Sequence, residues 1–265
     1  MFPLQTETFP ENAAALERAL TDSLRSLFVT TGDPVRITDS AYPQLQEIAV
    51  SLHHARLHRG IQPVSPNMAA NEDAFRVQSL TIAADALSVG PASFDLGMSA
   101  RDVVLSRSRD EAGQFLLWLK SAADGTIEMV ANQKDLETAI AAVARSEAAK
   151  RGVAVESVRL MLTPNGPRDV AAEVSIRARK LFLSATIRVT AHLALDDRMT
   201  AKLSGLACAG EGAIGSLACG VLTPHLQKLE GRAFPLLALP LGEIRLRDVR
   251  FAVADRIRIV AEFGV

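Results

Sequence analysis

Three histidines close together in the chain are the first candidates for chemistry. His53, His54 and His58 stand in the segment HHARLH, and His54 and His58 would share one face of a helix or a strand. Imidazoles at such spacing can ligate a metal or act as general bases. No carboxylate or cysteine lies within the segment. A partly exposed polar strand end is therefore the favoured interpretation, and a hydrolase or metal enzyme using these histidines is an alternative. No catalytic residue and no metal ligand is assigned.

The two cysteines, Cys208 and Cys219, flank a glycine-rich stretch. Two small buried thiols are the favoured interpretation, and a disulfide that closes this stretch is the alternative. Two thiols alone make a poor zinc site, because structural zinc takes four protein ligands. The glycines follow neither a phosphate-loop nor a dinucleotide-binding spacing, and no nucleophile-elbow motif occurs in the chain. We therefore expect no cofactor and no enzymatic activity.

Basic residues recur along the last strands that the sequence predicts. The favoured interpretation is that these residues lie on the outer face of an amphipathic sheet. The functional alternative is a basic patch that binds anionic headgroups, and hence peripheral membrane contact. Glu243 and Asp248 lie among them and weaken the patch. His192 falls on the polar side of its predicted strand, where a solvated position is favoured over a general base. The basic residues are Arg177, Arg179, Arg245, Arg247, Arg250, Arg256 and Arg258.

The composition excludes several classes of protein. Of the 265 residues 48% are hydrophobic but only 5% aromatic, so the apolar half is almost wholly aliphatic. This content argues against disorder, and a net charge of −1 argues against a nucleic-acid partner. No signal peptide and no apolar run of ~20 residues is present. The chain is expected to be soluble and cytoplasmic by default, or periplasmic or envelope-located if it is a processed product. The oligomeric state does not follow from the sequence.

Hydrophobic periodicity predicts three helices among a larger number of strands. Neighbouring strands joined by short turns favour antiparallel pairing, and no linker divides the chain, so we expect one α+β domain over residues 1–265. Residues 1–31 hold the N-terminal amphipathic helix. The helices are predicted at 11–29, 132–151 (with Asn132 as its cap) and 214–229, and the strands at 44–57, 75–89, 94–105, 115–119, 155–163, 170–178, 182–195, 199–208, 243–253 and 256–263.

From residue 124 to the end, the chain resembles a domain-of-unknown-function family of bacterial envelope proteins. That family is related to the mycobacterial lipomannan elongation factor and is similar to the tubular lipid-binding (TULIP) superfamily. Its members are usually exported or lipid-anchored. The resemblance rests on Gly125 to Met129 entering a helix through Asn132 to Leu136, on Leu206 to Gly215 before the last helix, on Leu239-Pro240-Leu241-Gly242, and on Ile244, Leu246, Val249, Val253, Ile257 and Ile259.

The resemblance implies a long, highly curved antiparallel sheet wrapped around one or two helices, with an apolar cleft for acyl or prenyl chains. Each buried methylene would contribute ~0.8 kcal/mol, and no catalytic group is required. The protein would then bind or carry a lipid or another hydrophobic small molecule. A structural or protein-interaction module with a filled core is the alternative. The residues expected to line the cleft are Leu136, Ile140, Val143, Phe182, Ile187, Val189, Leu217, Val221 and Leu222.

Overall fold

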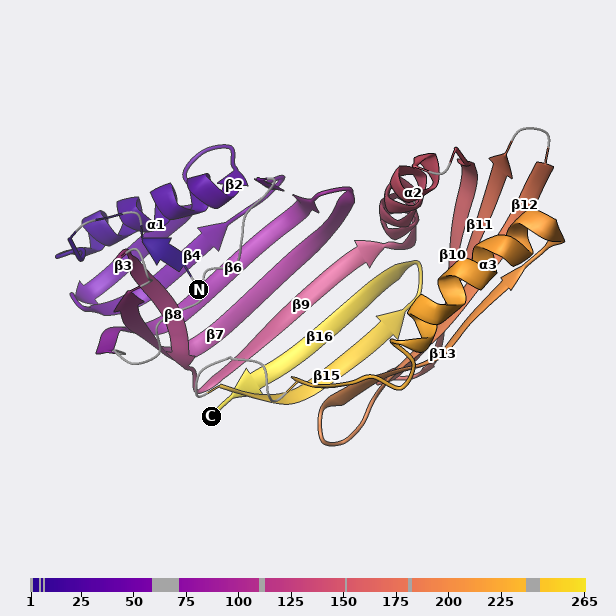
Figure 1. Cartoon of the computed structure of the whole chain (residues 1–265). Helices are drawn as coiled ribbons and strands as arrows, with labels where there is room; N and C mark the ends of the chain where they lie inside the picture. Colours follow the sequence, from indigo (N-terminus) through magenta and orange to yellow (C-terminus); the bar gives the residue numbers. More distant parts are fainter. Residues whose placement is uncertain are drawn as a thin grey trace. The chain divides into compact units, whose positions relative to one another are not determined.

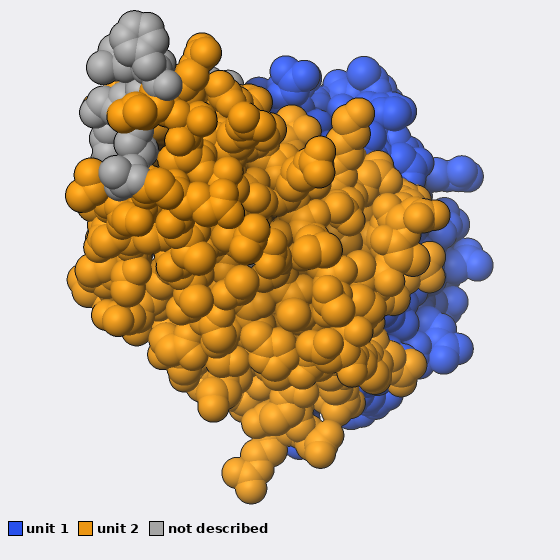
Figure 2. Space-filling model, turned by 90° about the vertical axis from the view of Figure 1, so that its right-hand side faces the viewer, with its two compact units in different colours: residues 1–129, 240–248, 260–265 blue, residues 130–239, 249–259 orange. Residues whose placement is uncertain are grey.

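The computed structural model describes residues 2–4, 6, 8–58, 72–109, 113–150, 152–180, 183–236 and 244–265. Its chain divides into two units, shown by colour in Figure 2. The first unit comprises 1–129, 240–248 and 260–265, and the second comprises 130–239 and 249–259. The sequence favours one continuous domain. That interpretation stays a prediction, because three strands contribute residues to both units.

The three predicted helices are confirmed, each with ends within two residues of the expected bounds (Figure 1). They are α1 (Ala13–Leu27), α2 (Gln133–Ala149) and α3 (Gly212–Gln227). Their 3.6-residue periodicity is a local signal, which explains why the sequence places them well. Within the described part of the chain, no helix is both long enough and apolar enough to cross a bilayer.

The first sheet contains most strands of the first unit together with the closing strands of the chain. Within the described residues it has eleven strands, in the order β15-β16-β9-β7-β6-β4-β3, with β8, β1, β5 and β2 attached at its sides. The strands are β1 (Phe2–Leu4), β2 (Phe28–Val29), β3 (Val35–Ala41), β4 (Gln44–Ser51), β5 (Arg56–Leu57), β6 (Glu72–Val89), β7 (Ala92–Arg109), β8 (Phe115–Ser121), β9 (Asp124–Asn132), β15 (Arg245–Val253) and β16 (Arg256–Gly264). Those with residues in both units are β9, β15 and β16.

The pairing of β4 with β6 departs from the antiparallel arrangement that the sequence favours. Both β4 and the short β5 pair with β6 in parallel, whereas β6 and β7 form a long antiparallel hairpin. Parallel neighbours need a long connection, and the twenty residues between Ser51 and Glu72 supply one. The wholly antiparallel sheet that the resemblance implies is therefore wrong at this point. The expectation for strands joined by short turns does not concern this pair.

The core of the first unit is filled. Asn12 caps α1 by accepting a hydrogen bond from the backbone N–H of Ala15 at 2.9 Å, and the helix buries Leu16, Leu20 and Leu24 in the core cluster. The ring of Phe75 lies in the same core and is 2% exposed. The described side chains of this core pack against one another.

The second unit contains a separate sheet of five strands. They follow one another in space as in sequence, in the order β10-β11-β12-β13-β14, and every pair is antiparallel. The described residues thus form two large sheets, where the family resemblance implies one long curved sheet. The α+β class and the predominance of antiparallel pairing are confirmed. The strands are β10 (Ala154–Gly166), β11 (Asp169–Lys180), β12 (Leu183–Leu195), β13 (Thr200–Gly210) and β14 (Ala233–Pro235).

Candidate functional site

One face of the second unit's sheet is made of aliphatic side chains. Residues opposite one another in an antiparallel ladder share a face, so the register defines rows that cross the sheet. One row runs through Leu160, Val174, Val189 and Cys208. A neighbouring row is Val158, Ile176 and Ile187. We call this surface the aliphatic face.

The opposite face is polar. Its rows include Glu173 beside Thr190, and Ser175 beside Arg188. The Arg188 guanidinium lies 3.1 Å from the Glu173 carboxylate. A pocket on this side is lined by Met161, Ala171, Glu173, Thr190 and His192 among others. The alternation that the sequence shows along β11 and β12 is therefore an alternation between an aliphatic and a polar side.

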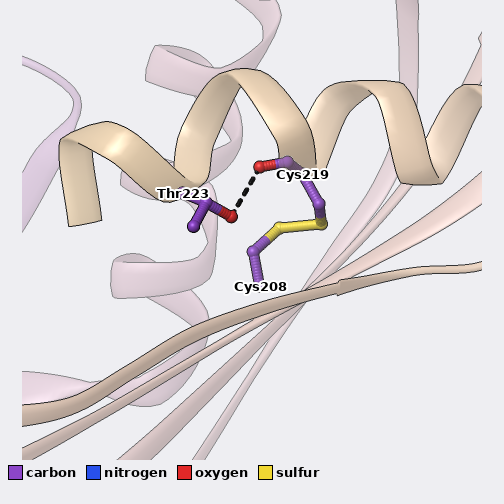
Figure 3. Close-up of a disulfide and its surroundings, with 3 residues drawn as sticks. All are labelled: Cys208, Cys219 and Thr223. Atoms are coloured by element: carbon purple, nitrogen blue, oxygen red, sulfur yellow. Dashed lines mark hydrogen bonds between the residues drawn. A yellow bond between two sulfur atoms is a disulfide. The ribbon is translucent and has the colours of Figure 1, made fainter. Parts of the chain in front are cut away.

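A disulfide attaches α3 to the aliphatic face (Figure 3). Cys208 of β13 is bonded to Cys219 of α3, with a Cα–Cα distance of 5.4 Å. The interpretation of two separate thiols is thus wrong, and the alternative of a disulfide is confirmed. The sequence could not decide, because pairing depends on how closely the strand and the helix approach in space.

Two glycines allow the first turn of α3 to reach the end of β13. A Cβ atom on Gly210 would lie 2.2 Å from the carbonyl carbon of Gly215, and one on Gly215 would lie 2.9 Å from that of Gly210. Any side chain at either position would push the helix away. The glycine-rich stretch is therefore a site of close backbone approach between the strand and α3.

The helix α2 covers the open edge of the same sheet. The amide of Gln133 donates to the backbone carbonyl of Leu160 at 2.6 Å, and the Glu137 carboxylate accepts from the backbone N–H of Leu160 at 2.8 Å. Leu160 belongs to β10, an edge strand. Asn132 precedes α2 as predicted, but its side chain donates to Asp135 at 3.1 Å instead of capping the backbone.

Between the strands that the helices contact, β11 keeps an incompletely covered aliphatic surface. The helix α2 packs on β10, and α3 packs on β12 and β13. On β11, Val170, Val174 and Ile176 are half-buried, whereas Ala178 near the end of the strand is buried. On β12, Ile187 is buried and Val189 is half-buried. An aliphatic strip thus runs along β11 without the complete burial that the core of the first unit shows.

The residues expected to line a cleft lie at three levels of exposure. Ile187 is buried, while Leu136, Ile140, Val189 and Leu222 are half-buried. The side chains of Val143, Leu217 and Val221 are exposed. Phe182 lies outside the described residues, as does the Leu239 to Gly242 segment that carried part of the family resemblance. The structure thus brings Val189 and Leu222 to the sheet side of α3 and leaves Leu217 and Val221 on its outer side.

The histidine segment lies in the first unit, after β4. His53 and His54 occupy an exposed turn, and the Nδ1 atom of His53 lies 2.8 Å from a carboxylate oxygen of Asp85. His58 is also exposed, and its backbone N–H donates to the carbonyl of Leu27. Among the residues that the structure describes, no three His, Cys, Asp or Glu side chains converge as metal ligands would.

A chain of hydrogen bonds on the polar face joins three side chains that the sequence does not bring together. His192 places Nε2 2.7 Å from the Asp169 carboxylate and Nδ1 3.3 Å from the Ser204 hydroxyl. Serine, histidine and aspartate in this order can support nucleophilic catalysis. The amides of Gly205 and Leu206, which follow the serine, already donate to the Glu230 carboxylate at 3.0 and 2.7 Å.

The amides of Gly205 and Leu206 are not available to a reaction at Ser204, because each already donates to Glu230. A serine nucleophile needs donors for the developing oxyanion, and the N–H of the next residue often supplies one. Glu230 holds the Gly205 and Leu206 amides in this structure. The three side chains come from β11, β12 and β13. We therefore interpret them as a network that ties three strands together.

The arginines of β11 have carboxylate partners. Arg177 and Arg179 lie 3.3 and 3.5 Å from the carboxylate of Glu156 on β10. On β15, the Arg247 guanidinium donates to the backbone carbonyl of Val265. Ion pairs of this kind are typical of the solvent-exposed face of an amphipathic sheet. They reduce the positive charge that Arg177 and Arg179 could offer to an anionic headgroup.

Searches for related proteins found no matching family model, no matching curated protein and no matching solved structure. The resemblance to the envelope family remains an expectation from the sequence.

Proposed function

We propose that the protein binds the acyl chain of a lipid, or a similar hydrophobic small molecule, along the half-buried strip of β11. The observation that carries the proposal is the continuity of the aliphatic face from β10 to β13 combined with the incomplete burial of Val174 and Ile176. Aliphatic side chains that water still reaches gain free energy when an acyl chain covers them, at ~0.8 kcal/mol per buried methylene.

The site requires no catalytic group. It lies between a helix that follows the sheet edge, α2, and a helix that a disulfide holds on the sheet, α3. An extended chain lying along β11 would contact the half-buried side chains from Val170 to Ile176. Carriage rather than conversion of the ligand is the activity that such a surface supports.

The second unit supports this proposal better than the first. In the first unit the described core cluster is buried to a few per cent exposure, as Leu16 at 0% and Leu24 at 1% illustrate. A filled core of this kind favours the second candidate, a structural or interaction module, for that part of the chain. We therefore assign ligand binding to the second unit alone.

The disulfide also bears on the compartment. Disulfides persist in oxidising surroundings and are rare in a reducing cytosol. We therefore propose a periplasmic, envelope or otherwise oxidising location instead of the cytoplasmic default. Thiol labelling of the protein taken directly from cells tests this, because a reduced pair of Cys208 and Cys219 would contradict it.

Native mass spectrometry after loading with palmitate or with phosphatidylglycerol tests lipid binding. We expect the unmodified protein to retain bound lipid. Val174→Trp, which places a bulky group on the aliphatic face, should reduce the retained fraction. Its matched control is Ser175→Trp, the next residue of β11, whose side chain lies on the polar face.

Two outcomes would contradict lipid binding. The first is no retained lipid in the unmodified protein with either probe. The second is equal retention in Val174→Trp and Ser175→Trp while circular dichroism shows both folded. If Val174→Trp does not fold, the smaller Val174→Phe is used in its place. Labelling of Ser204 by a fluorophosphonate would instead favour a hydrolase.

A further inference from the structure

A second apolar surface lies on the outer side of α3, away from the sheet. Leu217 is 73% exposed and Val221 is 47% exposed. At ~100° per residue, both side chains lie about 200° around the helix axis from Cys219, whose sulfur is bonded to the sheet. The outer side of α3 is therefore defined by the disulfide as well as by exposure.

The composition of α3 is unusual for a helix with an exposed side. None of its sixteen residues, Gly212–Gln227, is Asp, Glu, Lys or Arg. Its exposed positions hold Ser216, His225 and Gln227 as well as the two large apolar side chains. Here one side meets the sheet, and the other presents Leu217 and Val221.

Basic residues stand at the C-terminal end of this surface. Pro224 and Lys228 follow Val221 at spacings of three and seven residues, which continues the stripe that begins at Leu217. Arg232 follows in the next segment, and both cations are exposed. We call Leu217, Val221, Pro224 and Lys228 the outer stripe of α3.

A further exposed aromatic residue lies on the same side of the sheet as α3. Phe234 of β14 is 46% exposed and pairs with Ala201, which in turn pairs with Leu195. Leu195 is in phase with Leu193 and Val189 of the aliphatic face, so Phe234 shares that side. Aromatic and basic residues beside an apolar helix side are typical of surfaces that meet a membrane interface.

From this arrangement we infer that the outer stripe of α3 docks on the surface of a bilayer that contains anionic lipid. Leu217 and Val221 enter the acyl-chain boundary, and Lys228 and Arg232 remain at the level of the headgroups. The carboxylate of Glu230, which lies between the two cations in sequence, is held by the backbone amides of Gly205 and Leu206.

A second copy of the chain fits this surface less well than a bilayer does. A stable protein interface buries about 800 Å² on each partner and involves about 20 residues or more a side. The outer stripe offers two large apolar side chains on one helix. Insertion of two apolar side chains and attraction of two cations add to a weak, reversible membrane contact, which needs no interface of that area.

Vesicle flotation with the oxidised full chain tests the inference. The probes are vesicles of phosphatidylcholine alone and vesicles that also contain phosphatidylglycerol. We expect the protein to float with both and more strongly with the anionic vesicles. The double variant Leu217→Gln/Val221→Gln should reduce the floated fraction about tenfold, because its apolar side chains no longer enter the bilayer.

Charge and apolar contact are separated by two further variants. Lys228→Gln/Arg232→Gln should remove the preference for anionic vesicles and leave binding to neutral ones unchanged. The matched control is Met161→Gln, which alters an exposed apolar residue on the polar face of the sheet and should float as the unmodified protein does. If the double variant on α3 fails to fold, Leu217→Gln alone replaces it.

Three results would overturn the inference: no flotation of the unmodified protein, equal flotation of Leu217→Gln/Val221→Gln, or loss of self-association in that variant without any change in flotation. The inference is independent of the acyl-chain site on β11. A protein that retains palmitate but does not float would refute membrane docking alone, and the reverse result would refute lipid carriage alone.

Discussion

Glu137 of α2 accepts a hydrogen bond from the backbone N–H of Leu160 in the edge strand β10, at 2.8 Å. Gln133, one helical turn earlier, donates to the carbonyl of the same residue. Side chains of the helix thus take the place of a neighbouring strand at this point. An open edge is a template for pairing with another chain, and α2 covers part of it.

We therefore expect Glu137→Ala to weaken the fold of the second unit and to promote aggregation. Leaving the Leu160 amide without its acceptor should cost about 1–3 kcal/mol. Urea unfolding and light scattering measure the two effects. The control is Glu147→Ala, on the exposed last turn of α2, where Lys150 is the partner. Equal stability and equal scattering of the two variants would contradict a role for Glu137 in protecting the edge.

Glutamates accept from backbone amides of strands elsewhere in the chain, and hydrophobic periodicity does not predict these contacts. The carboxylate of Glu17 on α1 accepts from the backbone N–H of Ile37 in β3, at 2.7 Å. In the turn that follows α3, the Glu230 carboxylate likewise accepts from two successive amides of β13. Glutamates on a helix read as solvated positions in a periodicity analysis. Their partners are recognisable only when the strand that needs an acceptor has been placed.

Gly125 in β9 packs so closely against its neighbours that no side chain fits at this position. A Cβ at this position would lie 2.3 Å from the ring of Phe263 and 2.8 Å from the carbonyl oxygen of Ser99. Gly125→Ala should therefore destabilise the first unit by about 1–3 kcal/mol, since the ring and the strand must shift. Thermal unfolding followed by circular dichroism measures the change. Gly97→Ala in β7 is the matched control, because a Cβ there meets nothing within 4 Å. A smaller loss in Gly125→Ala than in Gly97→Ala would rule out this packing.

The disulfide gives α3 a covalent attachment in addition to its packing. The bridge closes a loop with a sequence separation of eleven residues, for which removal of a crosslink should cost about 3 kcal/mol. We expect Cys208→Ala/Cys219→Ala, or reduction of the unmodified protein, to accelerate amide hydrogen exchange in α3. Exchange in α1 serves as the internal control, because α1 belongs to the first unit. Unchanged protection of α3 after reduction would show that packing alone holds the helix.

The sequence predicted local elements better than it predicted their partners. The helices and most strands follow from periodicity within each segment. The parallel pairing of β4 with β6 and the bond between Cys208 and Cys219 depend on contacts between segments, which periodicity does not report. On α3, Leu217 and Val221 were expected to line the cleft, but they lie on the outer side of the helix. A helix without charged residues has no polar side by which its orientation could be predicted.

Asp169 makes the free energy of unfolding of the second unit depend on pH in the acid range. Its pKa lies below the usual value because Asn165 and His192 hydrogen-bond to the carboxylate, with His192 adding electrostatic attraction. An unfolded aspartate titrates at ~3.9. The contribution of the network is therefore complete above that pH, and it is lost as the pH falls through the lower pKa of the folded state.

We expect Asp169→Asn to be less stable than the unmodified protein at neutral pH, with a difference that shrinks once the pH falls below ~3.9. His192→Gln should raise the pKa of Asp169 toward its ordinary value and move the loss of stability to higher pH, because one source of the depression is removed. Urea unfolding from neutral to acid pH provides the curves. Asp255→Asn, in the exposed turn between β15 and β16, is the control and should show a constant difference. If the difference between Asp169→Asn and the unmodified protein does not change with pH, Asp169 is not held ionised by Asn165 and His192.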